Sequence, residues 1–215
     1  MSIRRVSFVP LLVLALAPGS ALAATRAHPV KPVCHIVVGT AAHTYLVRNA
    51  PGVTYEDPAL HITSADVATN GQLFTMVIRV IKLTAEPATS PMGAIYQMTF
   101  NVGDDSELFY VNVSTGPTAP YAEFGTRMNL PAVTSVPTVL GAPSAIVDLT
   151  HNEIRASFPL SLFHGHVTIV SHKTKIFPVE TTTGRGVHGH GVFADDTENA
   201  KFYIADTPSC VQVGK

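Results

Sequence analysis

The sequence is short of the residues that mark several large classes of protein. Among 215 residues it has no tryptophan and only two cysteines, and charged side chains make up 13% of it. The net charge of −1, with lysines and arginines spread thinly along the chain, gives no sign of the basic surface that nucleic-acid-binding proteins carry. No apolar stretch is long enough to span a bilayer as a helix. We therefore expect neither a nucleic-acid partner nor a membrane span.

The motifs of common enzyme classes are also missing. There is no Gly-x-Ser-x-Gly elbow, phosphate-binding loop, dinucleotide-binding fingerprint or His-Glu-x-x-His helix. A carboxylate pair for glycoside hydrolysis stays open, because its defining quantity is a distance in space that a sequence does not show. The sequence therefore favours a non-catalytic protein.

The first residues have the three parts of an export signal. Arg4 and Arg5 precede an apolar run over 6–16, and small residues stand at Ala21 and Ala23. This pattern predicts a signal peptide over 1–23, which implies a secreted product. The remaining residues, 24–215, suit a single domain.

The two cysteines, Cys34 and Cys210, lie near opposite ends of the predicted mature chain. Exported proteins meet an oxidising environment, in which disulfides form and persist. We predict a Cys34–Cys210 disulfide that joins the two termini. Two unpaired buried thiols are the alternative.

Apolar residues alternate with polar ones along much of the chain, which is the pattern of half-buried β-strands. The clearest case runs over 96–102, and turn residues at 103–106 connect it to a second alternating segment over 109–113. Another hairpin is predicted around the Asn70-Gly71 turn, with its second strand over 74–80. In each strand we expect one face on a core and one polar face in water.

The rest of the pattern completes an all-β prediction. We expect the following elements: strands over 154–158, 167–170, 176–179 and 202–204, a long loop over 115–143 with an edge strand near 121–126, and at most a helical turn over 160–164. No helical stripe with caps is present. The predicted fold is an antiparallel β-sandwich of jelly-roll or immunoglobulin-like type with its termini joined by the disulfide.

Two His-Gly-His pairs are the sharpest chemical signal. They are His164 with His166 and His188 with His190, and Asp195 and Asp196 follow the second pair. Residues two apart on an extended chain point the same way, so each pair could offer two imidazoles to zinc or copper. Exposed loop histidines are the alternative interpretation, because both pairs are built around glycine.

Other candidate ligands have simpler explanations. Asp104, Asp105 and Glu107 could bind calcium, but a hairpin turn accounts for them without an ion. Without tryptophan, the candidate stacking platforms for a sugar are Tyr45, Tyr55, Tyr110, Tyr121 and Tyr203. Asn112-Val113-Ser114 matches a glycosylation sequon, which we expect to be idle.

Several segments resemble a recurring pattern of bacterial exported proteins. They are 57–68, the Asn70-Gly71 turn, 77–83, 152–160 and 208–210. The pattern is similar to that of the DOMON-like and family 9 carbohydrate-binding-module-like β-sandwiches. This resemblance implies the fold, and a role in binding a sugar, haem or another ligand. Such modules often carry acidic cation ligands after the first strand, where this chain has 38–43 without any, so the resemblance transfers no binding residue.

Three functions remain open from the sequence. The leading hypothesis is a secreted, non-catalytic module that binds a carbohydrate or a cell-surface partner. A metal-binding protein or metal-dependent hydrolase that uses the two histidine pairs is the first alternative. A structural envelope protein without a ligand is the second, and the sequence does not give the oligomeric state.

Overall fold

The structure is a computed structural model that describes residues 30–39, 46–49, 53–85, 93–104, 107–116, 120–127, 137–187, 190–198 and 201–214. Lys31–Lys215 forms one compact unit. The signal peptide predicted over 1–23 lies outside the described residues. Within the described part, no helix has the length and apolar character needed to cross a membrane.

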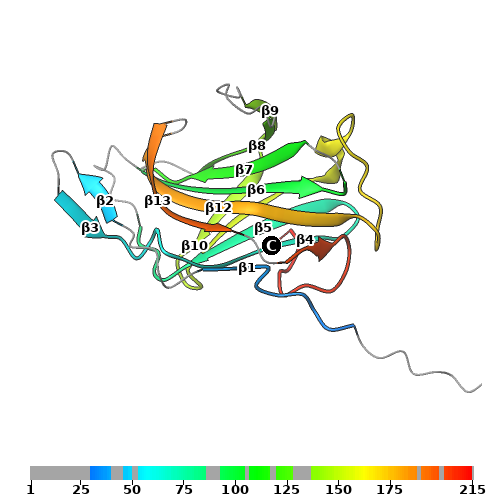
Figure 1. The fold of residues 1–215 in the computed structure, drawn as a ribbon, viewed down its shortest axis with the longest axis horizontal. Helices are drawn as coiled ribbons and strands as arrows, with labels where there is room; N and C mark the ends of the chain where they lie inside the picture. The colour runs from blue at the N-terminus through cyan, green and yellow to red at the C-terminus, as the bar shows by residue number, and fades with distance from the viewer. Residues whose placement is uncertain are drawn as a thin grey trace, which may run out of the picture. The chain divides into compact units, whose positions relative to one another are not determined.

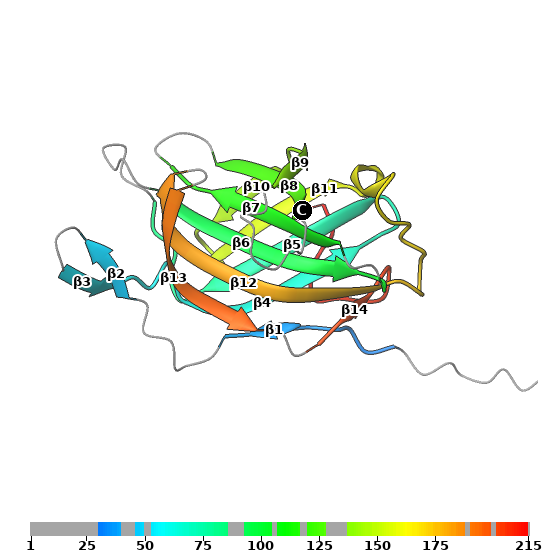
Figure 2. The ribbon, with the colours of Figure 1, turned by 45° about the horizontal axis from the view of Figure 1, so that its top comes forward.

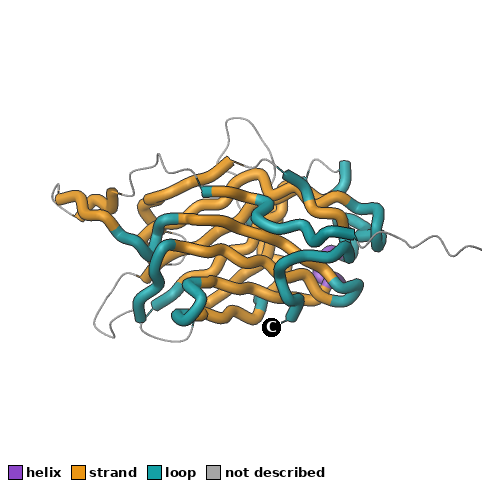
Figure 3. Tube along the Cα trace, turned by 90° about the horizontal axis from the view of Figure 1, so that it is seen from below, coloured by secondary structure: helices purple, strands orange, loops and turns teal. Residues whose placement is uncertain are grey.

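The regular secondary structure of the described residues is strand apart from one 3₁₀ helix, and most strands form two stacked antiparallel sheets (Figures 1 and 3). The five-stranded sheet has the order β1 (Val37–Val38), β4 (Ile62–Thr69), β5 (Leu73–Val80), β11 (Glu153–Pro159) and β10 (Ser144–Asp148). The seven-stranded sheet has the order β13 (His190–Glu198), β12 (Lys175–Val187), β6 (Gly93–Val102), β7 (Leu108–Ser114), β8 (Tyr121–Arg127) and β9 (Thr138–Gly141), with β14 (Tyr203–Ile204) also on β12. The strands β2 (Leu46–Asn49) and β3 (Val53–Glu56) pair only with each other. The predicted all-β sandwich is confirmed.

Both predicted hairpins are present. Strands β6 and β7 pair antiparallel with Phe100 opposite Phe109, and β4 pairs with β5. Gly71 has a φ of +79°, the left-handed conformation that a tight turn requires and that glycine adopts without steric penalty. The predicted helical turn is the 3₁₀ helix η1 (Leu160–Phe163).

The two sheets are stacked in Figure 2, and phenylalanine rings pack between them. Phe74 of β5 stacks on Phe100 of β6 at 5.0 Å between ring centroids. Phe124 of β8 stacks on Phe158 of β11 at 4.3 Å. The helix η1 places Phe163 edge-on against Phe124, at 4.9 Å. These contacts join strands of opposite sheets, so the apolar face of each predicted strand is the core face.

Some predicted elements are wrong. Residues 167–170 form no strand, because their amides bond locally: Val167 N donates to Phe163 O, and Val170 N donates to Thr174 Oγ1. The segment near 121–126 is a strand but not an edge, since β8 pairs with both β7 and β9. The strand predicted over 176–179 continues to Val187, past a bulge after Pro178.

The prediction that the polar face of 96–102 meets water is also wrong. Gln97 is 5% exposed and Thr99 is 2% exposed. Their neighbours in the register are Thr182 and Glu180 on β12, and Asn112 and Tyr110 on β7. Packing among side chains of adjacent strands on the outer face therefore removes these polar groups from solvent.

The two ends of the compact unit are held together, as predicted, by the Cys34–Cys210 disulfide. Val33 N donates to Pro208 O at 2.9 Å, and Cys210 N donates to Val33 O at 3.4 Å. Beyond the disulfide, the C-terminal segment lies on the five-stranded sheet, where Gly214 N donates to Thr75 Oγ1 at 3.0 Å. The disulfide therefore also anchors this segment.

Replacing both cysteines, C34S with C210S, should lower the free energy of unfolding by about 3 to 5 kcal/mol, because the bond closes a long loop and restricts the unfolded chain. The sequence separation of the bonded cysteines is 176. Urea unfolding of the variant and of the oxidised wild type measures the difference. Wild type unfolded in dithiothreitol is the control and should match the variant; equal stability of all three would contradict the prediction.

Candidate functional site

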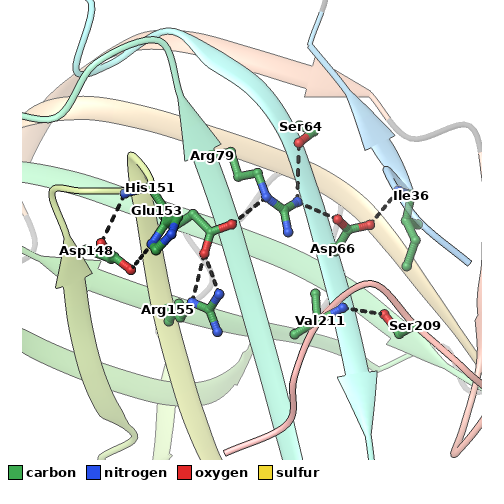
Figure 4. A network of polar contacts seen from close by, with 10 residues as sticks. All are labelled: Ile36, Ser64, Asp66, Arg79, Asp148, His151, Glu153, Arg155, Ser209 and Val211. Carbon is green, nitrogen blue, oxygen red and sulfur yellow. Dashed lines mark hydrogen bonds and ion pairs between the residues drawn. The ribbon is translucent and has the colours of Figure 1, made fainter. Parts of the chain in front are cut away.

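The outer face of the five-stranded sheet carries a chain of ion pairs (Figure 4). Arg79 of β5 donates from Nη1 to Asp66 Oδ2 at 2.5 Å and from Nε to Glu153 Oε1 at 2.7 Å. Arg155 donates to the other oxygen of Glu153, at 2.9 Å from its Nε. Asp66 is fully buried, and its second oxygen accepts the amide of Ile36 at 2.9 Å. Every charge in this network is paired.

The C-terminal segment covers the same face beside the network. Asp66 points away from the phenylalanine core, and its register partner Val77 lies on the same face. Ala68 follows Asp66 by two residues, so it also lies on this face. Both Ala68 and Val77 are nevertheless buried. Val211 is also buried and belongs to the same apolar cluster. Paired charges and a covering segment are the signs of a structural surface, so this face is not our candidate site.

The outer face of the seven-stranded sheet is different, and it is the candidate functional site. The register aligns one polar row across four strands: Thr182 of β12, Gln97 of β6, Asn112 of β7 and Glu123 of β8. All four residues are buried. Amide, hydroxyl and carboxylate groups thus stand side by side on a rigid sheet, where neighbouring side chains restrict their rotamers.

An arginine lies beside this row. Arg127 of β8 sits over the ring of Tyr110, with its guanidinium carbon 5.1 Å from the ring centroid. It also donates from Nη2 to Gln97 Oε1 at 3.0 Å. Tyr110 in turn lies over Gly125, where an added Cβ would come within 2.7 Å of the phenol oxygen. The glycine therefore makes the space in which Tyr110 and Arg127 stack.

Several polar atoms on this face have no hydrogen-bond partner among the described residues. They are Tyr110 Oη, Asn112 Oδ1, Ser114 Oγ and Thr182 Oγ1. Each belongs to a residue that is less than one tenth exposed. Buried polar groups are nearly always paired, and those that are not call for a water or a ligand. This is the observation that distinguishes the face from the opposite one.

Two tyrosines border Glu123. Burial raises the pKa of Tyr110, and the negative charge of Glu123 raises it further. The same causes, in the same order, raise the pKa of Tyr121, which is 47% exposed and donates to Glu123 Oε2 at 3.4 Å. Both phenols therefore stay protonated at neutral pH and can serve as hydrogen-bond donors. Tyr121 also presents its ring to solvent.

The structure describes the side chains of only the first predicted histidine pair. His164 and His166 line an open hollow of about 490 Å³ after η1. His166 Nδ1 is 3.1 Å from both carboxylate oxygens of Glu107. His188 lies outside the described residues, and so does the side chain of His190, which begins β13.

The backbone of His190 stands at the other end of the seven-stranded sheet. His190 pairs with Val187, close to the position where β12 meets Gly93, the first residue of β6. Glu107 instead precedes β7, whose start lies opposite the end of β6. Strand β6 separates these ends by about 30 Å. Within the described ranges, no group of three or more His, Cys, Asp or Glu side chains is placed to hold an ion.

The other candidates divide between core, site and undescribed chain. Tyr203 is buried and donates to Thr207 O at 2.8 Å, so it is a core residue. Tyr110 and Tyr121 belong to the candidate site, while Tyr45 and the side chain of Tyr55 lie outside the described part. Asp104 is in the predicted turn, and Asp105 is not described. The sequon residue Asn112 is buried within β7.

Sequence reasoning did not single out Gln97, Glu123, Arg127 or Thr182. Their signal was the polar half of each alternating strand, but alternation alone does not show which polar residues line up across strands. Thr182 became part of the row only because β12 extends beyond its predicted end.

Comparisons with models of protein families, with curated proteins and with solved structures find no match to this chain.

The Arg79–Glu153–Arg155 network predicts a pH dependence of stability. Burial works against the charged form of Glu153, but hydrogen bonds from Arg155 and Arg79 outweigh it and lower the pKa of Glu153 from 4.5. The unfolded chain then takes up the proton at a higher pH than the folded one. The free energy of unfolding should therefore fall as the pH drops below about 4.5 and through the lowered pKa.

Urea unfolding between about pH 6 and pH 3 measures this slope. The E153Q variant should be less stable at the upper pH and show a flatter slope. The comparison variant is D148N, because hydrogen bonds with His151 also lower the pKa of Asp148, but at an exposed site, so D148N should flatten the slope less than E153Q does. An E153Q slope as steep as that of wild type would contradict the assignment.

Proposed function

We propose that this protein is a secreted, non-catalytic β-sandwich module that binds a carbohydrate on the outer face of its seven-stranded sheet. The main observation that supports this proposal is the set of buried, unpartnered oxygens of Asn112, Ser114 and Thr182 on that face. A sugar presents many hydroxyl groups that both donate and accept hydrogen bonds. Because these oxygens are buried, the side chains of the row have to rearrange for such a ligand to reach them together with Gln97 and Glu123.

The tyrosines support a sugar over other polar ligands. A sugar ring has an apolar face, and aromatic side chains with a polar tip suit a ligand that is apolar on one side and wet on the other. The ring of Tyr121 is exposed at the margin of the face, and its hydroxyl is next to Glu123. The resemblance to carbohydrate-binding-module-like sandwiches accords with this proposal.

The disulfide supports secretion. Bonds such as Cys34–Cys210 persist in oxidising compartments and are rare in the cytosol. The export signal predicted over 1–23 would deliver the chain to such a compartment. Detection of a mature N-terminus near residue 24 in culture medium tests this part of the proposal.

The N112A/T182V double variant tests the site. It removes an amide and a hydroxyl from the polar row while leaving the core face intact. We expect the affinity for a glycan identified on an array to fall about tenfold or more, because each lost hydrogen bond contributes about 1 kcal/mol. Isothermal titration calorimetry measures the change.

The matched control is T63V, which removes an exposed hydroxyl from the five-stranded sheet and should leave binding unchanged. Binding that survives the double variant would move the site elsewhere. If no glycan on the array binds, the result would favour a structural protein without a ligand. Turnover of a bound glycan would contradict the non-catalytic assignment.

A second candidate function, metal binding, is favoured by one observation. Glu107 holds His166 Nδ1, an arrangement in which a carboxylate orients an imidazole so that its other nitrogen can bind zinc or copper. His164 lines the same hollow. On this alternative, H166Q should abolish stoichiometric zinc binding, and E107Q should weaken it about tenfold.

Elemental analysis of purified protein and a zinc titration provide the measurement. The control is H151Q, which changes a histidine that pairs with Asp148 outside this hollow. No bound metal in the wild type, or equal binding by all variants, would remove the alternative.

A further inference from the structure

Arg127 differs from the other arginines whose side chains the structure describes. Arg79 and Arg155 pair with Glu153, and Arg185 pairs with Asp57 at 2.5 Å. Among the described residues, Arg127 contacts only the ring of Tyr110 and the neutral amide oxygen of Gln97. Its positive charge is therefore not neutralised by any carboxylate in the described part of the chain.

The position of this charge is fixed although it lacks an anionic partner. The ring of Tyr110 supports one face of the guanidinium, and the bond to Gln97 uses one of its five N–H groups. Because the guanidinium is planar, these two contacts restrict the directions of the remaining donors. Arg127 is partly exposed, so those donors can reach a ligand.

We infer that the ligand of this face is an acidic glycan, and that Arg127 binds its carboxylate or sulfate group. The inference rests on the proposed function. A guanidinium matches the geometry of such an anion with two parallel hydrogen bonds, which a lysine does not reproduce. The polar row next to Arg127 would then bind the hydroxyl groups of the same sugar or its neighbour.

Nearby acidic residues form no ion pair with Arg127 in the described part of the chain. Glu123 and Arg127 both lie near Tyr110, but Glu123 accepts a hydrogen bond from Tyr121. The carboxylate of Glu107, which precedes β7, is bonded to His166. The donors of Arg127 that are not bonded to Gln97 therefore remain available to a ligand anion.

The test compares ligands that differ only in charge. Polygalacturonate and its methyl-esterified form share one backbone, and dextran sulfate and dextran provide the sulfate pair. Affinity electrophoresis and calorimetry at low salt should show preferential binding of the acidic member of at least one pair. The R127Q variant should lose about tenfold or more in affinity for that acidic ligand, and R127K should recover only part of the loss.

The matched control is K82Q, which removes an equal charge from an exposed position next to β5, in the other sheet, and should bind like the wild type. Equal binding of the neutral and acidic members, or loss in K82Q as large as in R127Q, would overturn the inference while leaving the proposed function standing. If neither the acidic nor the neutral member of either pair binds to the wild type, the result would instead contradict the proposed function. If R127Q does not fold, the comparison of methyl-esterified with unesterified polygalacturonate, measured on the wild type, still tests the inference.

Discussion

The layer of phenylalanine rings between the two sheets determines where everything else in this molecule lies. Phe74 and Phe158 come from one sheet, Phe100 and Phe124 from the other, and η1 adds Phe163. Burying each ring contributes about 1.5 to 3 kcal/mol. Because side chains alternate along a strand, fixing the inner face also fixes the outer one. A slip of one residue would exchange the two, so the core sets the polar row by the same contacts that stabilise the fold.

The two outer faces that result have different chemistry. On the five-stranded sheet the charges of Arg79, Asp66 and Glu153 neutralise one another, and the C-terminal segment, held by the disulfide, lies beside them. On the seven-stranded sheet Arg127 has no anionic partner among the described residues, and several buried oxygens are unpaired there. A sandwich of this kind can therefore use one sheet for stability and present the other to a ligand, which is the division that our proposal assigns to it.

How far the sequence could be interpreted depended on whether a signal was local. The hairpins β4–β5 and β6–β7 were predictable because alternation and turn residues lie within a few positions of each other. Strands β9 and β10 were not, because the prolines and glycines around them resemble those of a loop. The segment 167–170 has the β-branched composition of a strand, but its amides bond to nearby residues and leave no ladder to form.

By itself the sequence determined the all-β class, the hairpins and the disulfide, because the first two follow from residue types and the third from the placement of the only two cysteines near the ends of the predicted mature chain. Only the tertiary structure decided which polar residues form one surface, since the row from Thr182 to Glu123 joins four strands through their register. It also decided that Arg127 rests on Tyr110 without a carboxylate, while the other described arginines are neutralised. The physical reason is that charge pairing and burial are properties of distances between residues far apart in the chain, which no local pattern records.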